Sequence, residues 1–166
     1  ILNIFLTSDE GGLCRTIGGI YWIILSAGYL GSLLWGSAIL LVATMTNYDK
    51  TVVKTIGIVL ISVTLLYIRS AAGFSFGLLF GIGLIAFAQN FSTYACDVLL
   101  RYIGLTSSFY VILDIKSDLL DRNVPDSDAS KLAEMLHLPS QLVGGAWFFF
   151  ALFITWKVLR STVSGK

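Results

Sequence analysis

Charged residues are scarce in this 166-residue chain, and their scarcity indicates the solvent in which it folds. They make up 13% of the sequence, whereas an ordinary soluble domain carries about 25%. Hydrophobic residues make up 56%. So few charged side chains do not cover the surface of a water-soluble protein of this size. The sequence therefore predicts an integral membrane protein that crosses a lipid bilayer several times.

Residues that commonly carry chemistry are scarce as well. The one histidine, His137, reads as a surface or interface residue, because a single histidine does not build a usual zinc site. Cys14 and Cys96 lie far apart, one in a polar and one in an apolar segment, and predict no disulfide framework. The formal net charge of +1, without a basic block, argues against a nucleic-acid partner. The zinc-peptidase motif H-E-x-x-H is absent from these residues.

Long apolar runs are what the sequence has in abundance. A spanning helix needs about 20 mostly apolar residues, so the chain has room for roughly four to six crossings. The apolar runs lie at about 19–45, 51–68, 72–89, 98–115 and 142–159. The predicted fold class is therefore an all-α polytopic membrane protein with about five transmembrane helices.

Two segments outside these runs predict smaller elements. Residues 1–18 contain two short apolar stretches around the turn SDEGG at residues 8–12, which indicates a β-hairpin at or in the membrane surface. Residues 116–139 are hydrophilic, and apolar residues at helical spacing follow Pro125, which indicates a polar loop and a short amphipathic helix. The expected organisation is the hairpin at 1–18, transmembrane helices one to four at 19–115, the loop and amphipathic helix at 116–139, and the last transmembrane helix with a basic tail at 140–166.

Small residues in the first apolar run predict close helix packing. Gly28, Gly31 and Gly36 lie among serines and alanines. In lipid, hydrophobicity alone does not drive helices together, and small residues let two backbones approach. Spans rich in glycine and serine also suit contact with partners, so other membrane protein subunits are expected partners besides the bilayer.

Three charged residues in the fourth run or directly before it are candidate site residues. Asp97 and Arg101 are four residues apart, so on a helix they share a face and can pair within the membrane. The pair is either structural or part of an internal polar site, since charges at membrane depth usually face a cavity. Asp114 lies near the far end of the run. Taken alone, it is either a helix-end carboxylate that pairs with Lys116 or Lys54, or a functional acid.

Several segments, taken in order, resemble a known family. They are ILNIFLTSDEGGLCRTIGG at the start, SAGYLGSLLWG from residue 26, YIRSAAGF from residue 67, FYVILDIKSDLL from residue 109 and DSDASKLAEMLHLPS from residue 126. Together they resemble the B-like branch of the site-2 protease-type intramembrane zinc metallopeptidases. The resemblance covers nearly the whole chain.

The resemblance implies a zinc site built from residues far apart in the sequence. In that family the first membrane helix carries H-E-x-x-H, whose histidines bind zinc and whose glutamate is the general base. A hairpin with a Gly-Gly turn follows that helix, so the catalytic residues are expected upstream of Ile1. The third ligand is an aspartate in an L-D-G-like sequence. Its match here is Asp114 in Leu113-Asp114-Ile115, with isoleucine in place of glycine.

Three functions are compatible with this pattern. The resemblance implies a membrane-embedded metallopeptidase that cleaves peptide bonds in or next to the bilayer with zinc-activated water. The alternative is a catalytically silent relative that acts as a structural or accessory subunit of a larger membrane complex. The third is a small transporter or channel subunit that uses Asp97 and Arg101.

Overall fold

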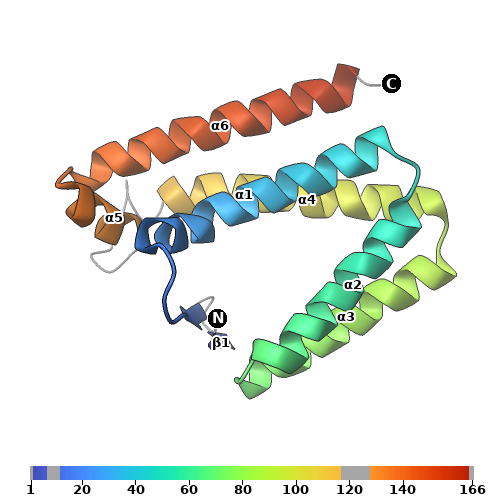
Figure 1. Cartoon of the computed structure of the whole chain (residues 1–166). Helices are drawn as coiled ribbons and strands as arrows, with labels where there is room; N and C mark the ends of the chain where they lie inside the picture. Colours follow the sequence, from blue (N-terminus) through green and yellow to red (C-terminus); the bar gives the residue numbers. More distant parts are fainter. Residues whose placement is uncertain (1, 7–11, 117–127, 165–166) are drawn as a thin grey trace. The chain divides into compact units, whose positions relative to one another are not determined.

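The computed structural model describes residues 2–6, 12–116 and 128–164, which are helical apart from one small hairpin and short connections (Figure 1). The elements are β1 (Asn3–Leu6), β2 (Gly12–Arg15), α1 (Tyr21–Met45), α2 (Asp49–Tyr67), α3 (Ala71–Asn90), α4 (Thr93–Ile115), α5 (Asp128–Leu136) and α6 (Ser140–Ser164). The predicted fold class is confirmed. Most of the predicted hairpin turn, at 7–11, and the predicted polar loop, at 117–127, lie outside the described residues.

The long helices match the dimensions of a bilayer. Four of them, α2, α3, α4 and α6, are long and apolar enough to cross it. A fifth crossing results if the two segments of α1, Trp22–Gly28 and Leu30–Met45, which are bent by 53°, form one span. The first segment ends at Gly28, and glycine is a common site of helix kinks. The chain is thus an integral, multi-pass membrane protein.

Large apolar side chains on the outer faces of the helices indicate a lipid environment. Trp35 and Leu79 are each 73% exposed, and Phe149 is 71% exposed. In water, such surface would drive association or aggregation. Against lipid tails it carries no comparable penalty, because the tails are as apolar as the side chains.

Helix α4 begins earlier than the apolar run predicts. The run starts near residue 98, whereas the helix starts at Thr93. The hydroxyl of Ser92 accepts a hydrogen bond from the Ala95 N–H at 3.2 Å, as an N-terminal cap does. This cap adds more than one turn to the helix, so Asp97 lies within the helix rather than before it.

The chain forms two compact units. The first, here the hairpin unit, comprises the N-terminal strands with Asn47–Val98, and the second, here the bundle unit, comprises Ile20–Thr46 with Leu99–Lys166. Within the hairpin unit, α2 and α3 run antiparallel side by side (Figure 1). A Cβ atom built on Gly57 would lie 2.8 Å from the Gly81 carbonyl oxygen. Glycine at these positions therefore allows the two backbones to approach closely.

Strand β1 is held on both of its edges within the hairpin unit. It pairs antiparallel with β2, with Asn3 opposite Arg15. On its other edge, the Ile4 carbonyl accepts the Arg69 N–H at 3.0 Å, and the Leu6 N–H donates to the Ser70 hydroxyl at 3.0 Å. A two-stranded hairpin is marginal alone. Its attachment to the connection between α2 and α3 supplies the missing stability.

The bundle unit has an apolar core between α1, α6 and the C-terminal part of α4. Leu33, Val111, Ile115 and Ala151 are at most 2% exposed and form one cluster. A second cluster joins α5 to α1 and α6. Its members are Leu25, Leu132, Ala133 and Val143. Helix α5 thus packs its apolar side on the bundle, as expected of an amphipathic helix.

Candidate functional site

Asp114 lies one residue before the C-terminal end of α4, at the border of the bundle core. Its side chain is half-buried. The neighbouring Ile115 is fully buried in the core cluster, whereas Leu113 is 63% exposed. The acid is therefore carried by a rigid helix at the edge of packed side chains. This position suits both readings of the residue, a helix-end carboxylate or a metal ligand.

The donors of a complete zinc site do not come together in the described part of the chain. A catalytic zinc ion takes three protein ligands and leaves one position open. Among residues 2–6, 12–116 and 128–164, no three His, Cys, Asp or Glu side chains are grouped so that they could hold a metal ion. These residues by themselves do not fit a zinc centre, and Asp114 can supply at most one ligand of one.

His137 has a structural role at the end of α5. Its φ of 56° places it in the left-handed region, where glycine is usual. The His137 N–H donates to the Glu134 carbonyl at 3.1 Å, and the Leu138 N–H donates to the Ala133 carbonyl at 2.9 Å. This pair of bonds is the Schellman motif that satisfies the last carbonyls of a helix. Its side chain is exposed, as expected of a surface histidine.

Replacing His137 with glycine is therefore expected to stabilise the protein. A left-handed conformation costs a residue with a Cβ atom about 1–2 kcal/mol, of which the greater freedom of glycine in the unfolded chain offsets part. We expect His137→Gly to raise the free energy of unfolding by about 0.5–1 kcal/mol. Thermal unfolding followed by circular dichroism measures it, with His137→Ala as the control that keeps the Cβ atom. A lower stability of the glycine variant would show that the imidazole itself contributes.

Arg101 reaches the end of another helix in the bundle unit. Its Nη2 donates to the Ala43 carbonyl at 3.3 Å. Ala43 lies in the last turn of α1, where carbonyls lack intrahelical partners and where a positive charge is favourable. Arg101 therefore helps to close α1. Asp97 lies one turn away on α4 and is half-buried. An ion pair between the two, and a polar site that uses it, stay predictions.

The small residues of α1 differ in what surrounds them. A Cβ atom on Gly36 would lie 2.9 Å from Ser107 Cβ and 3.0 Å from the Gly104 carbonyl oxygen. A Cβ atom on Gly104 would in turn lie 2.8 Å from the Gly36 carbonyl oxygen. The Ser107 hydroxyl donates to the Ser32 carbonyl at 3.0 Å across the same contact. At Gly31 an added Cβ would meet no heavy atom within 4 Å.

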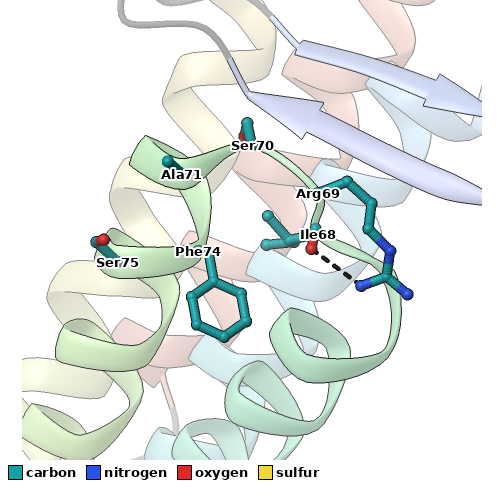
Figure 2. Close-up of a pocket in the computed structure, with 6 residues that line it drawn as sticks. All are labelled: Ile68, Arg69, Ser70, Ala71, Phe74 and Ser75. Carbon is teal, nitrogen blue, oxygen red and sulfur yellow. Dashed lines mark hydrogen bonds between the residues drawn. The ribbon is translucent and has the colours of Figure 1, made fainter.

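A hollow of about 350 Å³ lies at the connection between α2 and α3 (Figure 2). It is lined by Ile68, Arg69, Ser70, Ala71, Phe74 and Ser75. Figure 2 shows the Arg69 side chain folded back toward the Ile68 carbonyl, to which Nη1 donates at 3.1 Å. Nη1 also donates to the Leu65 carbonyl at 3.4 Å, and Nη2 donates to the Leu66 carbonyl at 2.6 Å. The guanidinium thus caps α2. Arg69 is the one basic side chain that lines the hollow, and its position is explained by this cap.

Residues 73–77, GFSFG, match the G-x-S-x-G pattern of serine hydrolases. That motif needs a sharp strand-to-helix turn, whereas Ser75 lies within α3. Packing explains both glycines. A Cβ on Gly73 would lie 3.0 Å from Leu6 Cβ, and a Cβ on Gly77 would overlap the Thr64 hydroxyl. The pattern therefore arises from contacts between β1, α2 and α3.

The polar caps are the roles that the sequence pattern missed. His137 and Arg69 both close helices, yet a histidine at a helix end and an arginine after an apolar run carry no distinctive spacing. Basic side chains near a helix C-terminus often donate hydrogen bonds to the last carbonyls. The position of Arg69 directly after an apolar run could therefore have predicted its role. The cap at Ser92 had a clearer signal, a serine directly before a helix start.

One comparison with known proteins gives a match. A family model described as peptidase M50B-like matches residues 1–158. No curated protein and no solved structure matches the chain. The matched stretch includes the hairpin, all of α1 to α5 and most of α6, so it covers Asp114 and every other residue described above up to Val158.

Proposed function

Since the chain belongs to the peptidase M50B-like family, we propose that it forms part of an intramembrane metallopeptidase that cleaves peptide bonds in or next to the bilayer. The family match over residues 1–158 carries this proposal. The four or five helices that can cross a membrane support it, because they place the residues that they carry in a medium that is poor in water. Family membership itself makes the protein related to membrane metallopeptidases.

Within this function, Asp114 is the metal ligand that these residues supply. Carboxylate oxygens are usual zinc ligands, and a ligand needs a rigid support. Asp114 has that support from α4, next to the fully buried Ile115. The proposal places the remaining donors, two histidines with their glutamate in H-E-x-x-H, on a helix before Ile1. The role of the present chain is to hold the aspartate and to pack the helices that surround it.

Zinc content tests the proposal without relying on turnover. The full-length protein, purified in detergent, is expected to hold about one zinc per chain by elemental analysis, as a single site requires. Asp114→Asn is expected to weaken zinc binding by at least about tenfold, since loss of even an outer-shell partner costs roughly 10–100-fold. Glu134→Gln removes an exposed carboxylate from α5 and should leave the zinc content unchanged.

Two outcomes would contradict parts of this proposal. Full zinc occupancy in Asp114→Asn, with unchanged affinity, would remove Asp114 from the ligand set. A full-length protein that binds no zinc and lacks H-E-x-x-H would remove the peptidase function. It would then be a silent relative, and a partner that co-purifies in fixed ratio would identify its complex. Circular dichroism of each variant checks that the helices are intact.

A further inference from the structure

The last turns of α6 carry aromatic and basic side chains on one face. Phe153, Trp156, Lys157, Arg160 and Ser161 follow the spacing i, i+3, i+4, i+7, i+8, which places them along one side of a helix. All five are exposed and together line a hollow of about 400 Å³. The opposite face packs inward, since Ala151, Thr155 and Val158 are buried. The hollow therefore opens outward from the bundle unit.

Arg160 and Ser161 in the hollow each make an identified contact. The Arg160 guanidinium lies 5.5 Å from the centre of the Trp156 ring, a cation–π distance that orients it over the aromatic floor. The Ser161 hydroxyl donates its proton to the Lys157 carbonyl at 3.0 Å. It therefore offers a ligand only an acceptor. The donors of the hollow are the two cations, and its five lining residues include no carboxylate.

The hollow lies where the membrane span ends. The span runs from Ser140 to Thr162, and exposed phenylalanines line it on the N-terminal side of the hollow. Phe149 and Phe153 are one turn apart and lead directly to Trp156. Tryptophan is enriched at the membrane–water interface, and long basic side chains extend there toward the headgroups. The order along α6 is thus apolar, then aromatic, then cationic, as the acyl chain, the interface and the headgroup of a lipid are ordered.

We propose that this hollow binds one anionic phospholipid, with its phosphate between Lys157 and Arg160 and an acyl chain along Phe153 and Phe149. Arginine matches phosphate oxygens with two parallel N–H donors, and lysine adds a point charge. An anionic headgroup balances two cations that share the hollow with no acid, whereas a zwitterionic headgroup brings its own positive charge. Continuity with the lipid-exposed phenylalanines favours a lipid over an acidic protein segment.

Native mass spectrometry of the full-length protein in detergent tests this inference. Phosphatidylglycerol and phosphatidylcholine with identical acyl chains are added in equal amounts. The wild type is expected to retain phosphatidylglycerol in preference by about tenfold to thirtyfold, as two basic residues at an anionic surface imply. Lys157→Gln/Arg160→Gln is expected to bring the two lipids to parity. Lys50→Gln/Lys54→Gln, which removes the same charge from α2, should keep the preference.

Four results would overturn the inference. The first is an unchanged preference in Lys157→Gln/Arg160→Gln, and the second is an equal loss in the α2 control pair, which would reveal general charge attraction. The third is displacement of the lipid by millimolar inorganic phosphate, which would indicate a plain anion site. The fourth is an acidic protein that only the wild type retains, without lipid selectivity.

Arg160→Lys preserves the charge and should fold. It is expected to show a preference for phosphatidylglycerol between those of the wild type and the double variant. A full wild-type preference would show that the guanidinium has no special role.

Discussion

Gly36→Leu is expected to disrupt the bundle unit. The first atom that the leucine adds would lie 2.9 Å from Ser107 Cβ and 3.0 Å from the Gly104 carbonyl oxygen. The Gly104 carbonyl belongs to the backbone of α4, so it cannot rotate away as a side chain can. Helices α1 and α4 must therefore separate, and the hydrogen bond from the Ser107 hydroxyl to the Ser32 carbonyl is lost. Overpacking usually costs about 1–3 kcal/mol, and a backbone obstacle places this variant at about 3 kcal/mol or more. Unfolding in a denaturing detergent, followed by circular dichroism, measures the loss.

Gly31→Leu is the matched control on the same helix. No heavy atom lies within 4 Å of the position where its Cβ would stand. Leucine is also a better helix former than glycine by roughly 1 kcal/mol. This variant should therefore be as stable as the wild type or slightly more stable. If Gly36→Leu and Gly31→Leu unfolded at the same detergent concentration, the close contact between α1 and α4 would be wrong.

Gly77→Ala is expected to destabilise the hairpin unit through a single methyl group. The added carbon would overlap the Thr64 hydroxyl and lie 3.1 Å from Thr64 Cγ2. Thr64 is fully buried, and its hydroxyl donates to the Leu60 carbonyl at 2.7 Å, so its side chain has no free rotation by which to yield. We expect a loss of about 2–3 kcal/mol, within the usual range for overpacking. The same detergent titration measures it.

Removing the obstacle should rescue this variant. Thr64→Ala deletes both the hydroxyl and Cγ2, so the double variant with Gly77→Ala should recover about 1–2 kcal/mol relative to the sum of the single changes. Gly83→Ala on α3 meets no heavy atom within 4 Å and serves as the control. Strict additivity of Thr64→Ala and Gly77→Ala would contradict the contact, because residues in contact are expected to couple.

The membrane helices could be predicted from the sequence because each apolar run has a polar or charged boundary. The third run, predicted at about 72–89, corresponds to α3 at Ala71–Asn90. The bend in α1 was not predictable in this way. Hydropathy indicates which residues lie in lipid, but it does not give the direction of the helix axis. The start of α4 was missed for another reason. The Ser92 cap is a local hydrogen bond whose effect on the helix start is independent of apolar content.

The candidate site was less accessible than the fold. Asp114 was one of three charged candidates, and only the family resemblance gave it the role of a metal ligand, which stays a proposal. In the sequence, Lys157 and Arg160 belonged only to the predicted basic tail of the last transmembrane helix. Their spacing with Trp156 was present in the sequence, but the inward packing of Thr155 and Val158 is what leaves that face open. Which side of α6 is exposed depends on how neighbouring helices pack against it, and a single sequence does not specify that packing.

The attachment of β1 to the connection between α2 and α3 has a consequence for biosynthesis. The Leu6 N–H and the Ser70 hydroxyl are 64 residues apart in the chain. At roughly 5–20 residues per second, the ribosome adds Ser70 several seconds after Leu6. During that interval the strand has no partner for its second edge. The close contact between Gly36 and Gly104 also forms late, because Gly104 is synthesised after the whole of α2 and α3. The long-range contacts of each unit therefore form late, whereas α2 and α3 can pair early because the contacts between them are local in the sequence.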